Sequence, residues 1–348
     1  MSTPRVSVLM AVHDGARFLP ESLASVLAQT WTDYELIVVD DASADATPDI
    51  LDEIADSRLV RLRNDRNLGL TRSLNRGLEH VRAPYIARLD DDDVAEPERL
   101  ARQLATLDAR REVTVLGTWT VEIDERGCEI GGERLDASPA FIAWQMTHRN
   151  TIYHSTVMTR TAEIRRLGGY DADLPYAQDH DLWTRVLMAG GVVTLLPELL
   201  TRYRRTAGQV TRTHSTEQMK LGLEVRQRYC AWLLDEPVQL AHVRDMMAVL
   251  GSKMFEMPAD AGPALDLIQR IRRASQRRAG RDDRRRIADA VCQKLLAQAY
   301  RRMHDDPRLA TRLAWQAFRA GVAGPETWRR TGAIGFRSAQ QLVRQHAR

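Results

Sequence analysis

The sequence predicts an α/β domain with a mostly parallel sheet that helices cover on both faces, followed by an all-α C-terminal region. Two observations support this prediction. In the first third of the chain, short apolar runs rich in β-branched residues alternate with segments of helical periodicity, which is typical of a parallel sheet. From about Thr216 onward, no convincing strand pattern occurs. We therefore expect two domains, residues 1–215 and residues 216–348.

Four apolar runs have the length and composition of buried strands, namely residues 6–12, 35–39, 59–62 and 85–89. A helical segment follows each run. The first has apolar side chains at helical spacing from Phe18 to Leu27, and the second begins at Thr47 and Pro48, an N-cap followed by proline at the first helical position. The other two helices are expected at residues 70–81 and 97–107.

The pattern changes after residue 107. Strands are expected at residues 113–123, 156–159 and 192–196, a glycine-rich turn or hairpin at 128–134, and helices at 141–146 and 181–189. In the last third of the chain, prolines separate segments of helical pattern. These predicted helices cover residues 216–234, 237–255, 263–279, 284–304, 308–320 and 325–346.

Composition excludes several classes of protein. The chain is 44% hydrophobic and 28% charged, which is typical of a folded globular protein. No apolar stretch approaches the roughly 20 residues of a membrane span, and the N-terminus lacks the order of a secretory signal. The three cysteines, Cys128, Cys230 and Cys292, form no CxxC pair. We therefore expect a cytoplasmic protein without a disulfide framework or a cysteine zinc site.

Charge is divided unevenly along the chain. Residues 1–214 carry 25 Lys and Arg against 33 Asp and Glu, a net charge of −8, whereas residues 215–348 carry 25 against 14, a net charge of +11. The basic residues of the second part lie among Leu, Ala, Trp and Met at helical spacing, without the signature of a nucleic-acid module. We therefore expect no nucleic-acid partner. A solvated helical surface is the favoured interpretation, and peripheral contact with an anionic membrane or an acidic partner is the alternative.

Polar residues follow three of the four predicted strands. His13 and Asp14 follow the first, Asp40 and Asp41 follow the second, and the run Asp90–Asp93 follows the fourth. In an open α/β sheet these strand ends lie at one edge, where ligands bind. Four adjacent carboxylates repel each other unless a cation or water screens them, and Mg²⁺ or Mn²⁺ commonly combines one or two carboxylates with phosphate oxygens. The sequence therefore favours a Mg²⁺ or Mn²⁺ site over a solvated acidic loop.

Residues 1–212 resemble glycosyltransferase family 2, proteins of bacterial polysaccharide synthesis with the GT-A fold. Three stretches carry the resemblance, in the family's order and spacing: VSVLMAVHDGARFLPESLASVLAQTWTDYELIVVDDASADAT, NLGLTRSLNRGLEHVRAPYIARLDDDDVAEPERL and GGYDADLPYAQDHDLWTRVLMAGG. The resemblance implies a GT-A, Rossmann-like sheet. It also implies sugar transfer, with inversion at the anomeric carbon, from a nucleotide sugar to a hydroxyl of a glycan or lipid-linked acceptor. A UDP-sugar is the expected donor, with dTDP and GDP left open.

The resemblance implies roles at the donor site. Asp41 matches the carboxylate that pairs with the donor base, and His13 stands where a stacking Tyr is frequent. In the run LDDDD, Asp92 matches the direct metal ligand, and Asp90 matches the residue that faces the ribose or metal-bound water. Asp91 takes the place of Asp90 if the register shifts by one residue, and both alternatives stay open.

Asn67, Gly69, Arg72 and Asn75 match a family motif that lines the nucleotide cleft. Arg72 is the candidate contact of the diphosphate, and an ordinary surface salt bridge is the alternative. The segment Gly168–Asp171 matches a turn near the acceptor and the donor sugar, although a tight turn alone would have the same sequence.

Asp179, in the stretch AQDHDLW, matches the catalytic base of the family. An acceptor hydroxyl is a poor nucleophile, and a carboxylate within hydrogen-bonding reach can take its proton during attack. Two alternatives remain: Asp179 caps the helix expected near Asp181, or Asp181 is the base. Three departures from the family, His13, Gln178 and Thr206, make a protein that binds the donor without turnover an alternative function.

Two other function classes share acidic strand ends. A sugar nucleotidyltransferase would begin with a glycine-rich basic phosphate loop, but Gly15 is the only glycine near the first strand and neither GxGxxG nor GxxxxGK[ST] occurs. A receiver-type signalling module would need a later Lys, and no Lys precedes Lys220.

The resemblance does not cover residues 216–348. For these helices we expect one of three roles: packing on the catalytic domain, formation of a homodimer, or contact with the inner face of the cell membrane near a lipid-linked acceptor.

Overall fold

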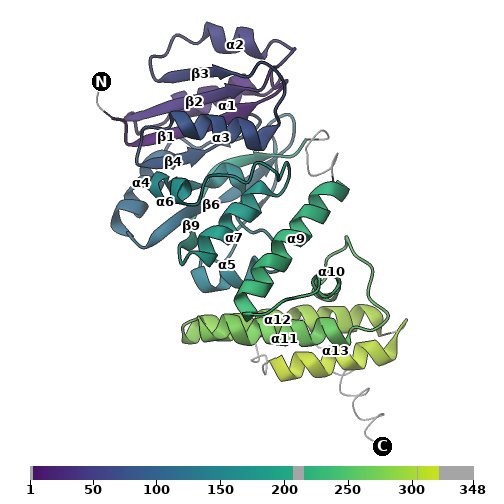
Figure 1. Cartoon of the computed structure of the whole chain (residues 1–348). Helices are drawn as coiled ribbons and strands as arrows, with labels where there is room; N and C mark the ends of the chain where they lie inside the picture. Colours follow the sequence, from purple (N-terminus) through teal and green to yellow (C-terminus); the bar gives the residue numbers. More distant parts are fainter. Residues whose placement is uncertain (1–2, 207–214, 304, 321–348) are drawn as a thin grey trace, which may run out of the picture. The chain divides into compact units, whose positions relative to one another are not determined.

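The computed structural model describes residues 3–206, 215–303 and 305–320 (Figure 1). These residues form two compact units. The first comprises the residues up to Ile142 together with Asn150–Val225, and the second comprises Ala143–Arg149 together with the chain from Arg226. The division falls inside two helices, α5 (Pro139–Gln145) and α9 (Ser215–Leu234).

One sheet organises the first unit, with strand order β3-β2-β1-β4-β8-β6-β9-β5 and with β7 paired to β6. The first four strands are parallel, as predicted: β1 (Val6–Val12), β2 (Tyr34–Asp40), β3 (Leu59–Arg63) and β4 (Tyr85–Arg88). Beyond β4 the sheet is mixed. β8 (Met158–Arg160) is antiparallel to β4 and to β6 (Val113–Ile123), and β6 is parallel to β9 (Val192–Arg204). The predicted α/β class is confirmed, with antiparallel pairs added on one side.

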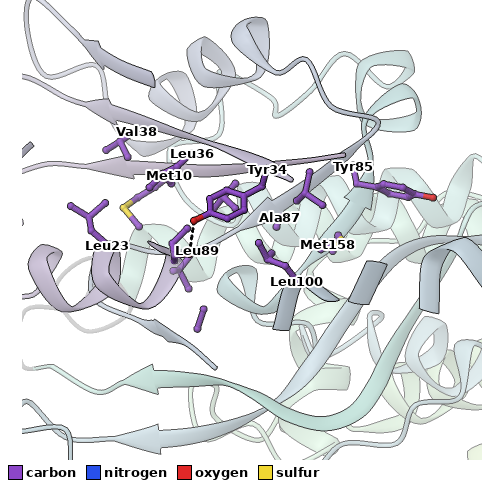
Figure 2. Close-up of a cluster of buried hydrophobic side chains, with 14 of the residues drawn as sticks. Met10, Leu23, Tyr34, Leu36, Val38, Tyr85, Ala87, Leu89, Leu100 and Met158 are labelled. Carbon is purple, nitrogen blue, oxygen red and sulfur yellow. Dashed lines mark hydrogen bonds between the residues drawn. The ribbon is translucent and has the colours of Figure 1, made fainter. Parts of the chain in front are cut away.

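Helices cover both faces of this sheet because successive side chains of each strand point to opposite faces. On one face, alternate residues of β1 and β2 such as Met10 and Leu36 share an apolar core with α1 (Leu19–Leu27) and α4 (Arg99–Ala109) (Figure 2). On the other face, Leu9 and Val39 lie against Gly77 of α3 (Leu70–His80). The sheet is therefore buried between two layers, and its strand ends are held rigidly.

Two elements next to the predicted site differ from expectation. α7 (Gln178–Met188) begins at Gln178 rather than at Asp181, so that Asp179 lies inside the first helical turn. β9 continues beyond the predicted end at Leu196 to Arg204, because β6 provides a hydrogen-bonding partner along its whole length. Register shifts near Thr118 and Trp119 allow the proline and the charged residues in β9 to be accommodated.

Three elements escape the periodicity analysis because they are too short to repeat a pattern several times. These are β5 (Val94–Ala95), α6 (Thr161–Arg166) and the 3-10 turn at His154–Thr156. By contrast, α2 (Thr47–Glu53) lies at a predicted position, and β7 (Glu129–Glu133) forms the hairpin with β6 that the glycine-rich stretch indicates.

The described part of the second unit is helical and confirms the all-α prediction (Figure 1). It includes the C-terminal part of α9, then α10 (Leu240–Val249), α11 (Gly262–Arg277), α12 (Arg281–Arg302) and α13 (Pro307–Ala320). Buried apolar residues such as Ile271, Leu295 and Leu313 join the last three. The helix predicted at residues 325–346 lies outside the described residues. Among the described helices, none is both long and apolar enough to cross a bilayer.

Leu36 offers a direct test of the core. It is fully buried in β2, so Leu36→Ala should lower the free energy of unfolding by about 2–5 kcal/mol through lost apolar burial and a residual cavity. Ile130, which is 56% exposed, is the control, and Ile130→Ala should change this free energy by less than about 0.5 kcal/mol. Urea denaturation followed by circular dichroism measures both, and equal effects of the two substitutions would contradict this packing.

Candidate active site

The carboxyl ends of β1, β2 and β4 bring their polar residues to one edge of the sheet, as predicted. The backbone there is strained. Four described residues other than glycine have positive φ, and three of them adjoin predicted site residues. These are Asp14 (52°) beside His13, Ala42 (57°) beside Asp41, and Ala177 (59°) just before the turn that carries Asp179. Such conformations cost on the order of 1–3 kcal/mol each and concentrate at functional sites.

Asp41 is 3% exposed, and both of its carboxylate oxygens accept hydrogen bonds from the chain. Oδ1 accepts from Asn64 Nδ2 at 2.6 Å and from the Leu68 N–H at 2.8 Å, and Oδ2 accepts from the Gly69 N–H at 2.8 Å. Asp41 therefore fixes the loop that leads into α3. A carboxylate has about four acceptor positions, so these three bonds leave capacity for one more donor.

His13 lies beside Asp41, with 40% of its side chain exposed. Its Nδ1 is 2.8 Å from the Asp41 carbonyl oxygen, and its Nε2 is 3.5 Å from the Asp14 carboxylate. These contacts orient the imidazole while part of it remains accessible to a planar ligand. Asp40 is buried instead, accepts from the Ser43 N–H at 2.9 Å, and so supports the turn after β2.

Asp90 is the anchored member of the four-aspartate run. One of its carboxylate oxygens pairs with the buried guanidinium of Arg88, and the other accepts from Ser155 Oγ at 2.6 Å. The Ser155 hydroxyl also accepts from the Asp90 N–H at 2.9 Å. Burial is the largest influence and would raise the pKa of Asp90, but the charges of Arg88 and His154 together with the hydrogen bonds from Ser155 and Arg88 hold that pKa below its usual range. Asp90 is therefore ionised and fixed in direction.

Asp93 and the backbone of the run are held by two further buried arginines. Arg204, at the end of β9, donates its N–H to Asp93 Oδ1 at 2.7 Å and its Nε–H to the Asp92 carbonyl at 2.8 Å, and it pairs with Glu21 of α1 at 2.6 Å. The positive charge of Arg99 acts on Asp93, although burial lowers the pKa of Arg99 to about 9. Arg99 therefore keeps its charge at neutral pH.

Asp91, Asp92 and Asp93 carry the uncompensated part of this negative charge. Burial and then the charges of Asp92 and Asp90 raise the pKa of Asp93 well above its usual range. Burial and then the neighbouring carboxylates raise the pKa of Asp91 to about 8, and burial and then Asp90 raise that of Asp92 to about 6. The Asp91 carboxylate lies against the loop after β1, where a Cβ on Gly15 would be 2.3 Å from Asp91 Oδ2. Only glycine permits this approach.

A divalent cation fits this donor set in part. Two half-buried carboxylates that repel each other would be stabilised by a cation, and oxygen donors suit Mg²⁺ or Mn²⁺. Within residues 3–206, 215–303 and 305–320, however, no group of three or more His, Cys, Asp or Glu side chains is arranged to hold a metal ion. A cation here would therefore need oxygen ligands from a bound molecule, as the phosphates of a nucleotide provide.

Asp179 lies in the first turn of α7, with a carboxylate that two donors orient. Asn150 Nδ2 donates to Oδ2 at 2.7 Å, and the His180 N–H is 2.7 Å from Oδ1. Burial raises the pKa of Asp179 to about 6, these two hydrogen bonds limit the rise, and the charge of Asp90 adds to it. Asp179 is thus within electrostatic reach of the acidic run, with a pKa suited to taking a proton near neutral pH.

Asp181 does not share these properties. It is 1% exposed, and its carboxylate accepts from Arg185 Nε at 2.7 Å. Arg185 also donates to the Leu167 and Gly169 carbonyls at 2.9 and 2.7 Å. Asp181 therefore anchors α7 to the turn at Gly168–Asp171, and the geometry favours Asp179 over Asp181 as the base.

The family motif that runs from Asn67 to Asn75 contains one residue with a structural role and two that are accessible to a ligand. Asn75 is structural, because its amide bonds both the carbonyl and the N–H of Tyr170 at 2.8 and 2.9 Å. Asn67 is exposed, and its Oδ1 accepts from the Gly69 N–H at 3.0 Å. Arg72 is exposed in the first turn of α3, and no hydrogen bond or ion pair engages its side chain within the described residues. Arg72 is thus accessible to an anionic ligand.

Three residues of this site escape the sequence analysis: Arg88, Ser155 and Asn150. Ser155 and Asn150 act through contacts with residues far away in the chain, and neither spacing nor periodicity shows such a contact. A buried strand that contains an arginine, as in YIAR of β4, is the one available signal, because an unpaired buried guanidinium is costly.

Comparison with known proteins relates this geometry to a family. Residues 7–161 match the family described as Glycosyl transferase family 2. EpsE of Bacillus subtilis, a protein named as a glycosyltransferase, is 35% identical over 220 residues, which cover 62% of this chain and 78% of EpsE. The chain belongs to glycosyltransferase family 2. This glycosyltransferase is also 32% identical over 162 residues to the amylovoran biosynthesis glycosyltransferase AmsE of Erwinia amylovora, across 47% of this chain and 60% of AmsE.

The fold comparison agrees with the family. The crystal structure of S. aureus TarS residues 1–349 in complex with UDP-GlcNAc superimposes with a TM-score of 0.57 at 16% identity, covering 90% of this chain and 92% of TarS 1–349. At this identity the likeness shows the fold, and it confirms the predicted GT-A architecture of this family 2 glycosyltransferase. An enzyme of this family is neither a sugar nucleotidyltransferase nor a receiver module, so those two alternatives are set aside.

The pKa of Asp179 predicts the pH dependence of this glycosyltransferase. A base with a pKa near 6 loses activity as the pH falls through about 6. Asn150 bonds the ionised form, so Asn150→Leu should raise the pKa and move the acid limb of the kcat profile upward by on the order of one pH unit. Asn67→Ala removes an amide that does not bond Asp179 and should leave that limb in place. An unchanged acid limb in Asn150→Leu would contradict the assignment of the base.

Proposed function

We propose that this family 2 glycosyltransferase moves a sugar from a UDP-sugar to a hydroxyl of a glycan or lipid-linked acceptor, with inversion at the anomeric carbon. The observation that supports this most is the pairing of two acidic groups at one edge of the sheet. The ionised Asp90, in the run Asp90–Asp93, lies within electrostatic reach of Asp179, a carboxylate with a pKa of about 6. Donor activation and proton removal can therefore occur side by side.

In the proposed reaction, Asp179 accepts the proton of the acceptor hydroxyl while that oxygen bonds to the anomeric carbon. The bond from the anomeric carbon to the diphosphate oxygen breaks on the opposite side, and the nucleoside diphosphate leaves with the electron pair. Asn150 and the His180 N–H orient the Asp179 carboxylate for this transfer, because they bond its two oxygens separately. The anionic edge also stabilises positive charge that develops on the sugar.

The donor site in this proposal is the loop cluster after β1, β2 and β4. Asp41 accepts from the donor base, His13 stacks beside it, and Asn67 and Arg72 line the nucleotide cleft, with Arg72 toward the diphosphate. Exposure of His13 and Arg72 supports these roles.

Asp92, with Asp90 or Asp91, would hold Mg²⁺ or Mn²⁺ at this donor site. Bound there, the cation would act as a Lewis acid and stabilise the charge of the departing diphosphate. The raised pKa values of Asp91 and Asp92 support this placement, because both carboxylates lack sufficient positive charge from the chain.

For the whole chain we propose a cytoplasmic enzyme of cell-envelope polysaccharide synthesis, with residues 1–215 as catalytic domain and residues 216–348 as an Arg-rich helical region. The likeness to AmsE, which is named for amylovoran biosynthesis, supports a glycan acceptor. The net charge of +11 in residues 215–348 supports peripheral contact with the anionic inner face of the membrane. A homodimer through these helices is the second proposed role.

Asp179→Asn separates catalysis from binding. The amide keeps the shape but cannot take a proton, so the rate of sugar transfer should fall by about 10²–10⁴-fold, whereas UDP binding should be unchanged. Asp181→Asn is unsuitable as a matched control because Asp181 anchors α7, so Asp173→Asn, at an exposed acid of the loop that precedes α7, serves instead. Transfer is measured as UDP release, and binding is measured by calorimetry.

Full activity of Asp179→Asn would show that the base is another residue. UDP binding by the wild-type protein without any transfer to glycan or lipid-linked acceptors would instead favour the non-catalytic alternative that the departures at His13, Gln178 and Thr206 suggest.

A further inference from the structure

A cavity of about 380 Å³ lies within the helical unit, between the segment that follows α10 and the C-terminal turns of α12. This volume accommodates a small organic ligand. Every residue of its lining belongs to the second unit, so the cavity does not form part of the acidic site of the sheet.

The lining of this cavity is cationic. The lining contains three basic side chains, those of Lys253, Arg301 and Arg302, and one acidic side chain, that of Asp305. Among the residues that the structure describes, none of these four side chains takes part in an ion pair or a hydrogen bond to another side chain. The two arginines lie in the last turn of α12, where the helix dipole favours positive charge, but that effect does not use their N–H donors. The cavity therefore presents a net positive charge and free donors.

Two polar groups of the cavity lining lack hydrogen-bond partners within the described residues, and one of them is a buried atom. Arg302 Nε is buried without a hydrogen bond. Gln298, one helical turn before Arg302, is 7% exposed and lines the cavity, and within the described residues its amide is not hydrogen-bonded. Burying a guanidinium N–H without a partner is costly, and the Gln298 amide has a free donor, so a ligand that accepts hydrogen bonds would be stabilised here.

A glycine in the lining, Gly251, keeps this part of the cavity open. Gly251 has a φ of 98°, and a Cβ there would lie 2.9 Å from Gln298 Nε2. A larger residue would be strained and would press on the amide. Phe255 and Met257 add apolar walls, which suit the organic part of an ester.

We propose that this cavity binds a phosphate-bearing ligand, with Lys253, Arg301 and Arg302 pairing with the phosphate oxygens and the amide of Gln298 as a further donor. Arginine forks and lysine suit the several oxygens and the double charge of a phosphate monoester or diphosphate. The phosphate belongs either to a free phosphate ester or to a lipid headgroup. This inference is independent of the proposed sugar transfer, because no residue of the acidic site takes part.

The test uses the full chain and inorganic pyrophosphate in EDTA, which keeps divalent metal away from the acidic site. We expect saturable binding by calorimetry and at least tenfold weaker binding in Arg301→Gln/Arg302→Gln, because two charge-assisted contacts are lost. Arg281→Gln, at an exposed arginine on the first turn of the same helix, controls for overall charge and should bind as the wild type. Gln298→Leu should weaken binding without lowering the unfolding temperature, since the amide has no partner among the described residues.

A second arm identifies the source of the phosphate. The protein is floated with phosphatidylcholine vesicles that contain or lack phosphatidic acid. If the ligand is a lipid headgroup, the vesicles with phosphatidic acid should capture the wild type but not Arg301→Gln/Arg302→Gln. Pyrophosphate binding without vesicle capture assigns a free phosphate ester. Absence of both in the wild type, or equal loss in Arg281→Gln, would overturn the proposal. Asp92→Ala, which alters the proposed donor site, should still bind pyrophosphate in EDTA. This variant therefore distinguishes an error in the proposed donor site from an error in the proposal for this cavity.

Discussion

The four carboxylates of Asp90–Asp93 and the three buried guanidiniums around them are the constraint on which the site depends. Arg88, Arg99 and Arg204 come from β4, α4 and β9, so the balance of charge joins three elements, of which β9 is distant in sequence from the other two. The arginines neutralise Asp90 and hold the backbone of the run, but the pKa values of Asp91 and Asp92 stay raised. The chain thus builds most of an anionic site and leaves a deficit of positive charge that a ligand can supply.

The same network positions the proposed base. Ser155 bonds Asp90 and lies next to His154, whose Nε2 is 2.8 Å from the Tyr170 hydroxyl. The Tyr170 backbone is clamped by Asn75 of α3, and the adjoining turn is clamped by Arg185 of α7. Hydrogen bonds and short stretches of chain therefore link the run Asp90–Asp93 to the helix that carries Asp179, and they fix how far Asp90 lies from Asp179.

Much of this arrangement could be predicted from the sequence, because continuous apolar runs indicate β1–β4 and apolar side chains at helical spacing indicate their helices. The acidic strand ends followed, since parallel strands bring their carboxyl ends to one edge. The pattern could not show that β9 extends to Arg204, that Asp179 lies inside α7, or that Arg88, Asn150 and Ser155 support the carboxylates. These features depend on contacts across the sheet rather than on local spacing, and β5 is too short to have a period.

The central claim is that the charge deficit at Asp91 and Asp92 makes nucleoside diphosphate binding depend on a divalent cation. Calorimetric titration of UDP into the wild-type protein and into Asp92→Ala, each with and without Mn²⁺, measures this directly. We predict that UDP binds the wild type only with Mn²⁺ and that Asp92→Ala does not bind it under either condition. Equal UDP affinity with and without Mn²⁺, or unchanged affinity in Asp92→Ala, would contradict the claim.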